Sequence, residues 1–352
     1  MANLFLDGHK LLYHPQTVAK WLSGEDFPPI HVELSPTSAC NQKCKLCYAA
    51  HAGHRPDHLP RELLESLVDS LAKMGVKSML LAGDGEPLVN KHCAVTVSRA
   101  RSKGIDVALN SNGVLMKPGI SEEVLEHLTW MRYSIMAARP ETYAELHGTS
   151  PDDLKKAADN IRAAVEIKKR RGLEVTIGIQ SVLVLENGEE IPEIAALAKD
   201  IGVDYYVLKP FSLHSENAYD VPADLHERHE KKLKEAQRLE TPDFKVIIRW
   251  NTFADHGRRD YERCLGLPFI AQIGADGGVY TCCPFFGDGD FLYGNLHDET
   301  FEQIWYGERR KKLTEEIARH LDLSKCMTYC RHHQINKFLW QIVHPPDHVN
   351  FI

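Results

Sequence analysis

The sequence predicts an α/β protein built from a partial (β/α)6 barrel, similar to a TIM barrel, and a small C-terminal extension. The chain has 352 residues, of which 43% are hydrophobic, as in a globular protein of about two domains. Short apolar runs alternate with amphipathic helical stretches between residues 30 and 215. The composition then changes, and cysteines gather again from residue 264 onward.

The composition also argues against several classes of protein. The formal net charge of −7 provides no basic field for a nucleic-acid backbone. The sequence contains no run of about 18 apolar residues, which argues against a membrane span. The N-terminus lacks the pattern of a secretory signal. We therefore expect a cytoplasmic protein without nucleic-acid or membrane partners. Its nine cysteines are not expected to form disulfides, and their clustering indicates metal binding.

The barrel elements follow from the hydrophobic pattern. The clearest helix spans residues 60–74, because its leucines repeat on one face, Pro60 stands at its start and Gly75 follows its end. Repeated strand–helix alternation predicts parallel strands with functional residues in the loops after their carboxyl ends. The six expected strands lie at residues 31–35, 78–82, 105–109, 132–136, 174–183 and 203–208.

Beyond the barrel, a charged segment reads as a helical connector on the surface. It is followed by a hairpin at residues 269–282 and a helix at 300–320. We expect the last residues, which are rich in proline, histidine and aromatic side chains, to pack on the protein. The expected divisions are an N-terminal extension (1–27), the barrel (28–215), the connector (216–257), the cysteine-rich extension (258–335) and a tail (336–352).

A first cysteine group follows the first strand. Cys40, Cys44 and Cys47 form a CxxxCxxC motif, and three thiolates at this spacing can surround one metal centre. A closed zinc site needs a fourth ligand, whereas an iron–sulfur cluster held by three cysteines leaves one iron open to a substrate or cofactor. The spacing favours iron–sulfur over zinc, for which the fourth ligand would come from His51, His54 or His58.

This motif, placed after the first strand of a six-unit barrel, resembles that of the radical S-adenosylmethionine (SAM) enzymes. The resemblance implies that Cys40, Cys44 and Cys47 hold a 4Fe-4S cluster whose fourth iron is chelated by SAM. Turns after later strands extend the likeness, because Gly83 to Pro87 is similar to the GGEP-like turn and Asn110 to Gly113 to the T-N-G turn. Asp84, Met136 and Leu46 depart from the usual pattern. The implied cofactor contacts are Gly85, Glu86, Pro87, Asn110, Asn112, Ser134 and Gln180, and Arg139, Glu141 and His147 match the helix that follows.

A second cysteine group lies in the C-terminal extension. Twelve residues separate Cys264 from Gly277, four residues separate Gly277 from Cys282, and a CxxxC pair follows at Cys326 and Cys330. Four buried cysteines without metal would be the simplest alternative. The pattern resembles the SPASM/Twitch extension of many radical SAM enzymes, which implies one auxiliary 4Fe-4S cluster bound by these four cysteines. Cys283 is then spare and is a candidate hydrogen donor, whereas Cys93 is expected to be a core residue.

The resemblance implies an enzyme that cleaves SAM to a 5'-deoxyadenosyl radical, which removes hydrogen from an unactivated carbon. An external one-electron reductant of flavodoxin or ferredoxin type would be needed. We expect net dehydrogenation of a small hydroxylated molecule, such as a sugar, aminocyclitol or nucleoside, with the auxiliary cluster as electron acceptor. Candidates for the base are Lys209, His214 and Glu33.

Three alternatives remain open. Epimerisation or decarboxylation would use the same cofactors and differ in the redox state of the product. Peptide modification is a second possibility, although few residues precede the first strand, which favours small molecules. A non-catalytic metal-binding or electron-transfer protein is the third, and it would neither bind nor cleave SAM.

Overall fold

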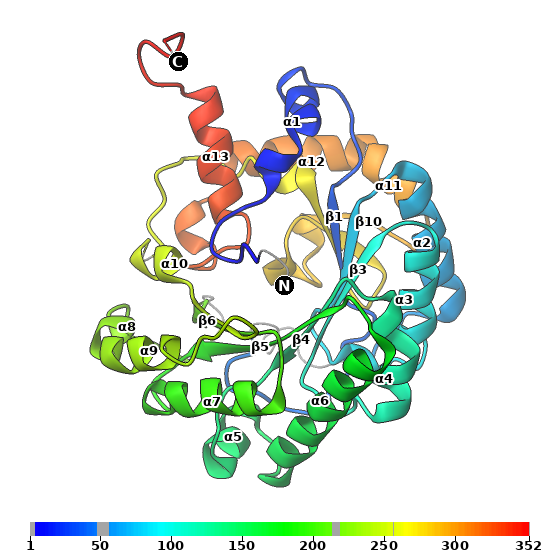
Figure 1. Ribbon diagram of the computed structural model, residues 1–352. Coiled ribbons are helices and arrows are strands. Elements are labelled where there is room, and N and C mark those ends of the chain that lie inside the picture. The colour runs from blue at the N-terminus through cyan, green and yellow to red at the C-terminus, as the bar shows by residue number, and fades with distance from the viewer. Residues whose placement is uncertain (1–3, 48–55, 213–218, 256, 352) are drawn as a thin grey trace.

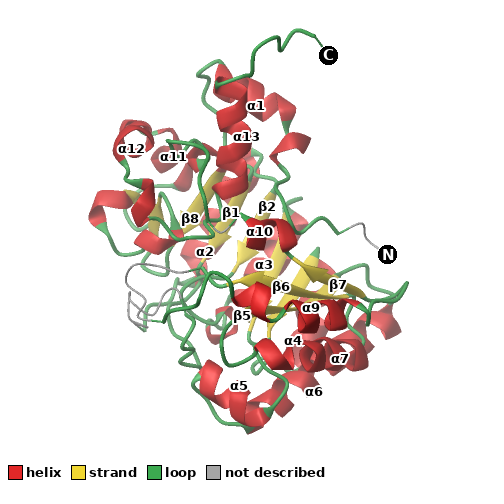
Figure 2. Cartoon of the chain, turned by 90° about the vertical axis from the view of Figure 1, so that its left-hand side faces the viewer, coloured by secondary structure: helices red, strands yellow, loops and turns green. Residues whose placement is uncertain are grey.

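The computed structural model describes residues 4–47, 56–212, 219–255 and 257–351, which form a curved sheet with helices on its outside (Figures 1 and 2). The sheet has ten strands in the order β10-β9-β8-β1-β2-β3-β4-β5-β6-β7. Neighbours from β8 through β1 to β7 pair in parallel. The strands are β1 His31–Leu34, β2 Ser78–Leu81, β3 Asp106–Ser111, β4 Trp130–Ser134, β5 Thr176–Leu183, β6 Tyr205–Pro210, β7 Lys245–Ile248, β8 Ile270–Ile273, β9 Gly278–Tyr280 and β10 Leu292–Asn295.

Most of the helices lie around the outside of the curved sheet (Figure 1). In the main hydrophobic core, alternate strand residues pack against these helices, among them Val32, Leu34, Met79 and Leu81. The helices are α1 Pro15–Leu22, α2 Arg61–Met74, α3 Cys93–Ser102, α4 Pro118–Val124, α5 Pro140–His147, α6 Asp152–Arg171, α7 Ile191–Ile201, α8 Leu225–Arg228, α9 Glu230–Gln237, α10 Trp250–Ala254, α11 Phe301–Tyr306, α12 Glu308–His320 and α13 His333–Val343.

The predicted partial barrel is confirmed. All six expected strands are present within a few residues of their expected bounds. Helix α2 also forms as expected, since its leucine face is buried and Gly75, at φ 82°, ends it in the left-handed conformation. Cys93 is a buried core residue on α3, as the sequence predicts.

The segment expected to be a helical surface connector also contributes a strand to the barrel sheet. After α8 and α9 it forms β7, which extends the sheet in parallel with β6. Leu233, Val246 and Ile248 are buried in the main core. The high charge of the segment concealed this strand, because only alternate residues of β7 face the core.

The C-terminal extension is joined directly to the barrel sheet. The expected hairpin exists as β8 and β9, but β8 also pairs in parallel with β1, which the sequence did not indicate. The helix expected at 300–320 is two helices, because Gly307 has an extended backbone between α11 and α12.

The two chain ends pack together at one side of the molecule. Val18 of α1 and Leu339 of α13 belong to one small buried cluster with Phe269, and both figures show the two helices side by side. Beyond Val343 the expectation of a packed tail is wrong, since residues 343–351 are exposed and Phe351 keeps 87% of its surface. Within the described ranges, no helix is long and apolar enough to cross a membrane.

Candidate active site and metal centres

The turn after β2 packs tightly on the chain that follows β1. The backbone N–H of Glu86 donates a hydrogen bond to the carbonyl of Ala39 at 3.0 Å. A Cβ atom at Gly85 would collide with the carbonyl oxygens of Thr37 and Ala39. Glycine is therefore required at this position for the close approach of the two backbones.

The carboxylate of Glu86 joins this turn to the turn after β3. Glu86 is only 3% exposed, and its two oxygens accept hydrogen bonds from the backbone N–H groups of Asn112, at 2.8 Å, and Leu88, at 3.3 Å. Burial raises the pKa of Glu86 to about 7. Asn112 in turn donates from its side chain to Asn41, inside the CxxxCxxC motif, at 2.7 Å. The three loops that follow β1, β2 and β3 are thus held together through Glu86 and Asn112.

Helix α5 supports the cysteine loop from the other side. The backbone N–H groups of Lys43 and Lys45 donate to the carbonyls of His147 and Leu146. Gln42, which is buried, bonds through its side chain to Nδ1 of His147 at 2.9 Å and to the hydroxyl of Tyr143 at 3.1 Å. The sequence matched His147 to a helix pattern but gave no role for Gln42.

The thiols of the first cysteine group lie near one another. Burial raises the pKa of Cys40 to about 11, and Cys47 adds to the shift. Burial together with Cys47 and Cys40 raises the pKa of Cys44 further. Nδ1 of His147 also lies 3.7 Å from Sγ of Cys44. Thiols in such a setting release their protons when metal binds, so this donor set fits an iron–sulfur cluster with three cysteine ligands.

The remaining implied cofactor contacts lie on the strands beside these loops. Asn110 of β3 accepts a hydrogen bond from Nε of Arg132 at 3.2 Å. Ser134 of β4 and Gln180 of β5 are register partners. Pro87 is buried next to Glu86. All of these residues therefore lie on β3, β4, β5 or the loop after β2.

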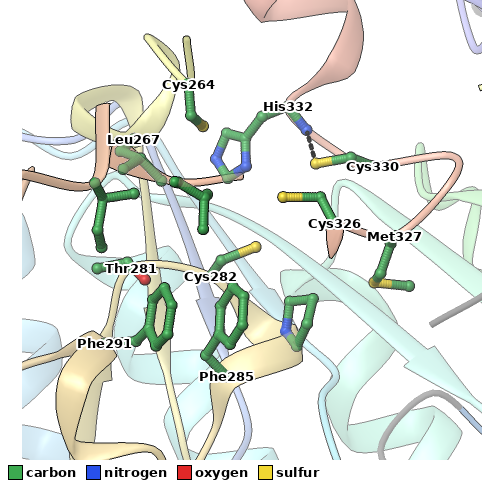
Figure 3. Close-up of a pocket in the computed structure, with 13 residues that line it drawn as sticks. Cys264, Leu267, Thr281, Cys282, Phe285, Phe291, Cys326, Met327, Cys330 and His332 are labelled. Atoms are coloured by element: carbon green, nitrogen blue, oxygen red, sulfur yellow. Dashed lines mark hydrogen bonds between the residues drawn. The ribbon is translucent and has the colours of Figure 1, made fainter. Parts of the chain in front are cut away.

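The second cysteine group surrounds one pocket in the C-terminal extension. Figure 3 shows the sulfurs of Cys264, Cys282, Cys326 and Cys330 directed toward a common space. Hydrogen bonding to Cys283 and Cys330 raises the pKa of Cys282, and burial raises the pKa of Cys264 to about 12. The structure thus brings together around one pocket the four cysteines that the sequence analysis grouped. The other lining residues are Leu267, Thr281, Pro284, Phe285, Phe291, Ile317, Leu321, Met327 and His332.

His332 is a feature of this pocket that the sequence analysis did not anticipate. Its ring is 1% exposed and points into the pocket, and neither ring nitrogen has a hydrogen-bond partner among the described residues. Its backbone N–H donates to Sγ of Cys330 at 3.4 Å. Unsatisfied polar atoms inside an otherwise apolar pocket indicate a group that is bound there.

The geometry of the described residues suits a cluster better than a single ion. No three His, Cys, Asp or Glu side chains in this part of the chain converge closely enough to hold one metal ion. The four thiols instead stand around a shared space, as the larger iron–sulfur clusters require. Cys283 is buried but does not line the pocket.

The residues expected to act as base lie in different surroundings. Lys209, near the end of β6, is partly buried, and burial, followed by the charges of Arg132 and Arg249, lowers its pKa to about 8. Glu33 of β1 forms an ion pair with Arg331, next to Cys330. His214 lies outside the described residues.

Comparison with known proteins agrees with this geometry. The family model of the radical SAM superfamily matches residues 34–198, and that of the SPASM iron–sulfur cluster-binding domain matches residues 264–332. The chain belongs to the radical SAM superfamily and carries a SPASM domain. It is therefore a radical SAM enzyme. Its cofactors are SAM, a 4Fe-4S cluster that binds SAM, and auxiliary iron–sulfur clusters.

The relatives act on diverse substrates. An AdoMet-dependent heme synthase of Methanosarcina barkeri is 26% identical over 290 residues, which cover 76% of this chain and 80% of the relative. A tungsten-containing aldehyde ferredoxin oxidoreductase cofactor-modifying protein of Pyrococcus furiosus is 23% identical over 79% of this chain and 81% of its own. The crystal structure of Streptococcus suis SuiB, also solved with its precursor peptide SuiA, has a TM-score of 0.66 at 16% identity and covers 92% of this chain and 78% of SuiB. At that identity the likeness concerns the fold alone.

Proposed function

We propose that this enzyme is an oxidoreductase that dehydrogenates a small hydroxylated molecule inside the barrel. One observation carries the proposal. Glu33, on the face of β1 opposite the core residues Val32 and Leu34, forms an ion pair with Arg331, which directly follows the pocket residue Cys330. This contact supports an auxiliary site beside the inner face of the barrel, where an electron acceptor could serve a substrate held there.

In this proposal Cys40, Cys44 and Cys47 hold the SAM-binding cluster, and Cys264, Cys282, Cys326 and Cys330 hold one auxiliary cluster. When bound, these groups and SAM supply a 5'-deoxyadenosyl radical for hydrogen abstraction and a site that takes up one electron. Glu86 and Asn112 keep the three cofactor loops in register through buried hydrogen bonds. Gly85 lets the backbone of its turn approach the cysteine loop.

The substrate loses one hydrogen atom from carbon, one proton from its hydroxyl and one electron. Lys209 is the proposed acceptor of the proton, because a pKa of about 8 leaves part of its amine neutral near pH 7. Cys283 is the proposed alternative hydrogen donor for a redox-neutral epimerisation. We place the protein in the reducing cytoplasm, with an external flavodoxin or ferredoxin as reductant.

Anaerobic turnover tests this proposal. The reconstituted enzyme is incubated with SAM, reductant and a panel of sugars, aminocyclitols and nucleosides, and 5'-deoxyadenosine and products are followed by mass spectrometry. A product two mass units lighter than its substrate, formed in equal amount to 5'-deoxyadenosine, supports dehydrogenation. A product of unchanged mass indicates epimerisation, loss of 44 units indicates decarboxylation, and failure of the enzyme to cleave SAM contradicts the proposal.

A second candidate is modification of a larger substrate, such as a tetrapyrrole or a peptide. It is favoured by the similarity to the heme synthase of Methanosarcina barkeri, which aligns over 76% of this chain. Coproheme-type tetrapyrroles and synthetic peptides are therefore included in the same panel. Their turnover, with the hydroxylated molecules inert, would replace the first candidate by the second.

A further inference from the structure

Three strands place basic side chains on the inner face of the barrel. On β4, Met131 and Tyr133 belong to the core shared with the helices, so Arg132 between them faces inward. On β6, Leu208 is a core residue and Lys209 lies on the opposite face. Arg249 follows the core residue Ile248 of β7 in the same way. We refer to Arg132, Lys209 and Arg249 as the cationic cluster.

The members of the cationic cluster lie close enough to affect one another. The charges of Arg132 and Arg249 both disfavour the protonated form of Lys209, and Arg132 does the same to Arg249. All three side chains are partly buried but keep accessible surface, so a bound molecule can reach them. Placing like charges together where they are partly buried lowers the stability of the folded protein, and other interactions in the fold must compensate for this cost.

Few anionic groups balance these charges. Arg132 is held by uncharged partners, namely the amide of Asn110 at 3.2 Å, the ring of Trp130 at 4.8 Å and the hydroxyl of Tyr205. Lys209 has no hydrogen-bond or ion-pair partner among the described residues. Arg249 lies 3.7 Å from Asp7, and its Nε forms no hydrogen bond in the described part of the chain.

Within the described ranges, one carboxylate forms an ion pair with the cationic cluster, and it is itself heavily engaged. Asp7 accepts hydrogen bonds from the backbone N–H groups of Asn251 and Thr252 and from the hydroxyl of Thr252. Glu33, the other inward carboxylate, is paired with Arg331. Among the described residues, Asp7 is thus the one carboxylate paired with a member of the cationic cluster, and it also caps the start of α10.

The neighbouring strand is shaped to keep Arg132 in place. Gly178 of β5 is the register partner of both Arg132 and Tyr205. A Cβ atom at position 178 would collide with the ring of Tyr205. The missing side chain lets the Tyr205 ring lie across β5 toward Arg132, where its hydroxyl holds the guanidinium without neutralising it.

We propose that the substrate carries an oxyanion group, a carboxylate or a phosphate, that binds between the guanidinium groups of Arg132 and Arg249. Planar guanidinium groups suit both anions because they can donate two parallel hydrogen bonds. Anchoring the anion there sets the rest of the substrate beside Lys209, the proposed proton acceptor. The inference rests on the proposed function only in taking the barrel interior as the substrate site.

Thermal unfolding of the reconstituted holoenzyme tests the inference without turnover. Inorganic phosphate and acetate are the two probes, each compared with sodium chloride at equal ionic strength. At ten times its dissociation constant, a probe that binds the cationic cluster raises the Tm by about 2 °C. Phosphate acting alone would identify a phosphate-type substrate, and acetate acting alone a carboxylate-type one. A Tm that neither probe raises, at any concentration up to the onset of general salt effects, overturns the inference.

Variants assign the effect to the cluster. Arg132→Gln and Arg249→Gln should each remove the anion-dependent shift, while Arg61→Gln, on the surface of α2 beside Glu65, should retain it. Arg132→Gln should also raise the Tm in the absence of oxyanions, because repulsion within the cluster is relieved. An anion shift that persists in both cluster variants, or that is lost equally in Arg61→Gln, contradicts the assignment. SAM cleavage is measured in parallel. If the enzyme fails to cleave SAM while the anions still raise its Tm, that result contradicts the proposed function and leaves the oxyanion site standing.

Discussion

Nδ1 of His147 donates a hydrogen bond to the side-chain oxygen of Gln42 at 2.9 Å, which connects helix α5 to the centre of the CxxxCxxC motif. The tautomer follows from the other ring nitrogen, because Nε2 accepts a hydrogen bond from the backbone N–H of Met136 at 3.2 Å. Protonation would break that second bond, and burial lowers the pKa of His147 to about 3. The imidazole is thus neutral and fixed beside Sγ of Cys44, as outer partners of metal ligands commonly are.

Replacing this imidazole should weaken the first metal centre. His147→Phe keeps a ring stacked on Tyr143 but removes both hydrogen bonds, so the free energy of unfolding should fall by about 1–3 kcal/mol. Iron retention by the first site should fall about 10- to 100-fold. Iron per chain after desalting and chemical denaturation measure the two effects. His320→Phe, at the exposed end of α12, is the control, and equal iron content in both variants would contradict the prediction.

Gly85 offers a test of the close backbone approach. Gly85→Ala should push the turn after β2 away from Thr37 and Ala39, with a cost of about 1–3 kcal/mol in the free energy of unfolding and weaker SAM binding. Gly119→Ala, in α4, is a matched control because nothing lies within 4 Å of the added carbon. Thermal unfolding and equilibrium dialysis with labelled SAM measure both effects. Indistinguishable behaviour of the two variants would show that the turn has room for a side chain.

Two adjacent cysteines should behave differently. Cys282→Ser removes a thiol that lines the auxiliary pocket, whereas Cys283→Ser alters a buried thiol outside it. Iron per chain should fall by about half in the first variant and stay unchanged in the second, because one of two 4Fe-4S clusters is lost. Iron and sulfide assays after anaerobic reconstitution give the counts. The reverse pattern would move the ligand role to Cys283.

His31 should make stability depend on pH in the acidic range. Burial, together with the charge of Arg331, lowers the pKa of His31 to about 4 from 6.5, so the folded protein resists protonation where the unfolded chain accepts it. The free energy of unfolding is therefore highest above pH 6.5, where His31 is neutral in both states, and it falls as the pH drops toward 4. The loss amounts to roughly 1–3 kcal/mol.

Urea unfolding between pH 7 and 4 measures this dependence. His31→Gln should flatten the curve in that window, and His320→Gln, at an exposed position, should leave it as in the wild type. A wild-type slope that survives in His31→Gln would assign the acid sensitivity to other groups.

Local patterns predicted the barrel well because each of its first six strands carries its own apolar run followed by a helix. They did not predict β7, a four-residue strand inside a charged segment, or the pairing of β8 with β1, which depends on contacts remote in the sequence. Spacing within each motif was sufficient to group the cysteines of both sites. The Gln42–His147 bond could not be read in this way, since the two residues meet only after the chain has folded.

The side chains that face into the barrel could not be predicted from the sequence either. Arg132 lies in β4 and Arg249 directly after β7, with no motif around either, and the direction of each follows from the alternation of the neighbouring core residues. Lys209 was identified by its place at a strand end, but the two arginines that change its charge state were not. His332 adjoins the CxxxC pair, so its position next to Cys330 was the one available signal for the pocket histidine.

The parallel pairing of β1 with β8 has a consequence for biosynthesis. During translation β1 emerges early, but its second neighbour, Ile270–Ile273, leaves the ribosome only after most of the barrel has been made. Until then the β1 edge next to the CxxxCxxC loop presents unpaired backbone groups, which in a nascent chain invite pairing with other strands. Completion of the barrel sheet on this side of β1 thus waits for the C-terminal quarter of the chain.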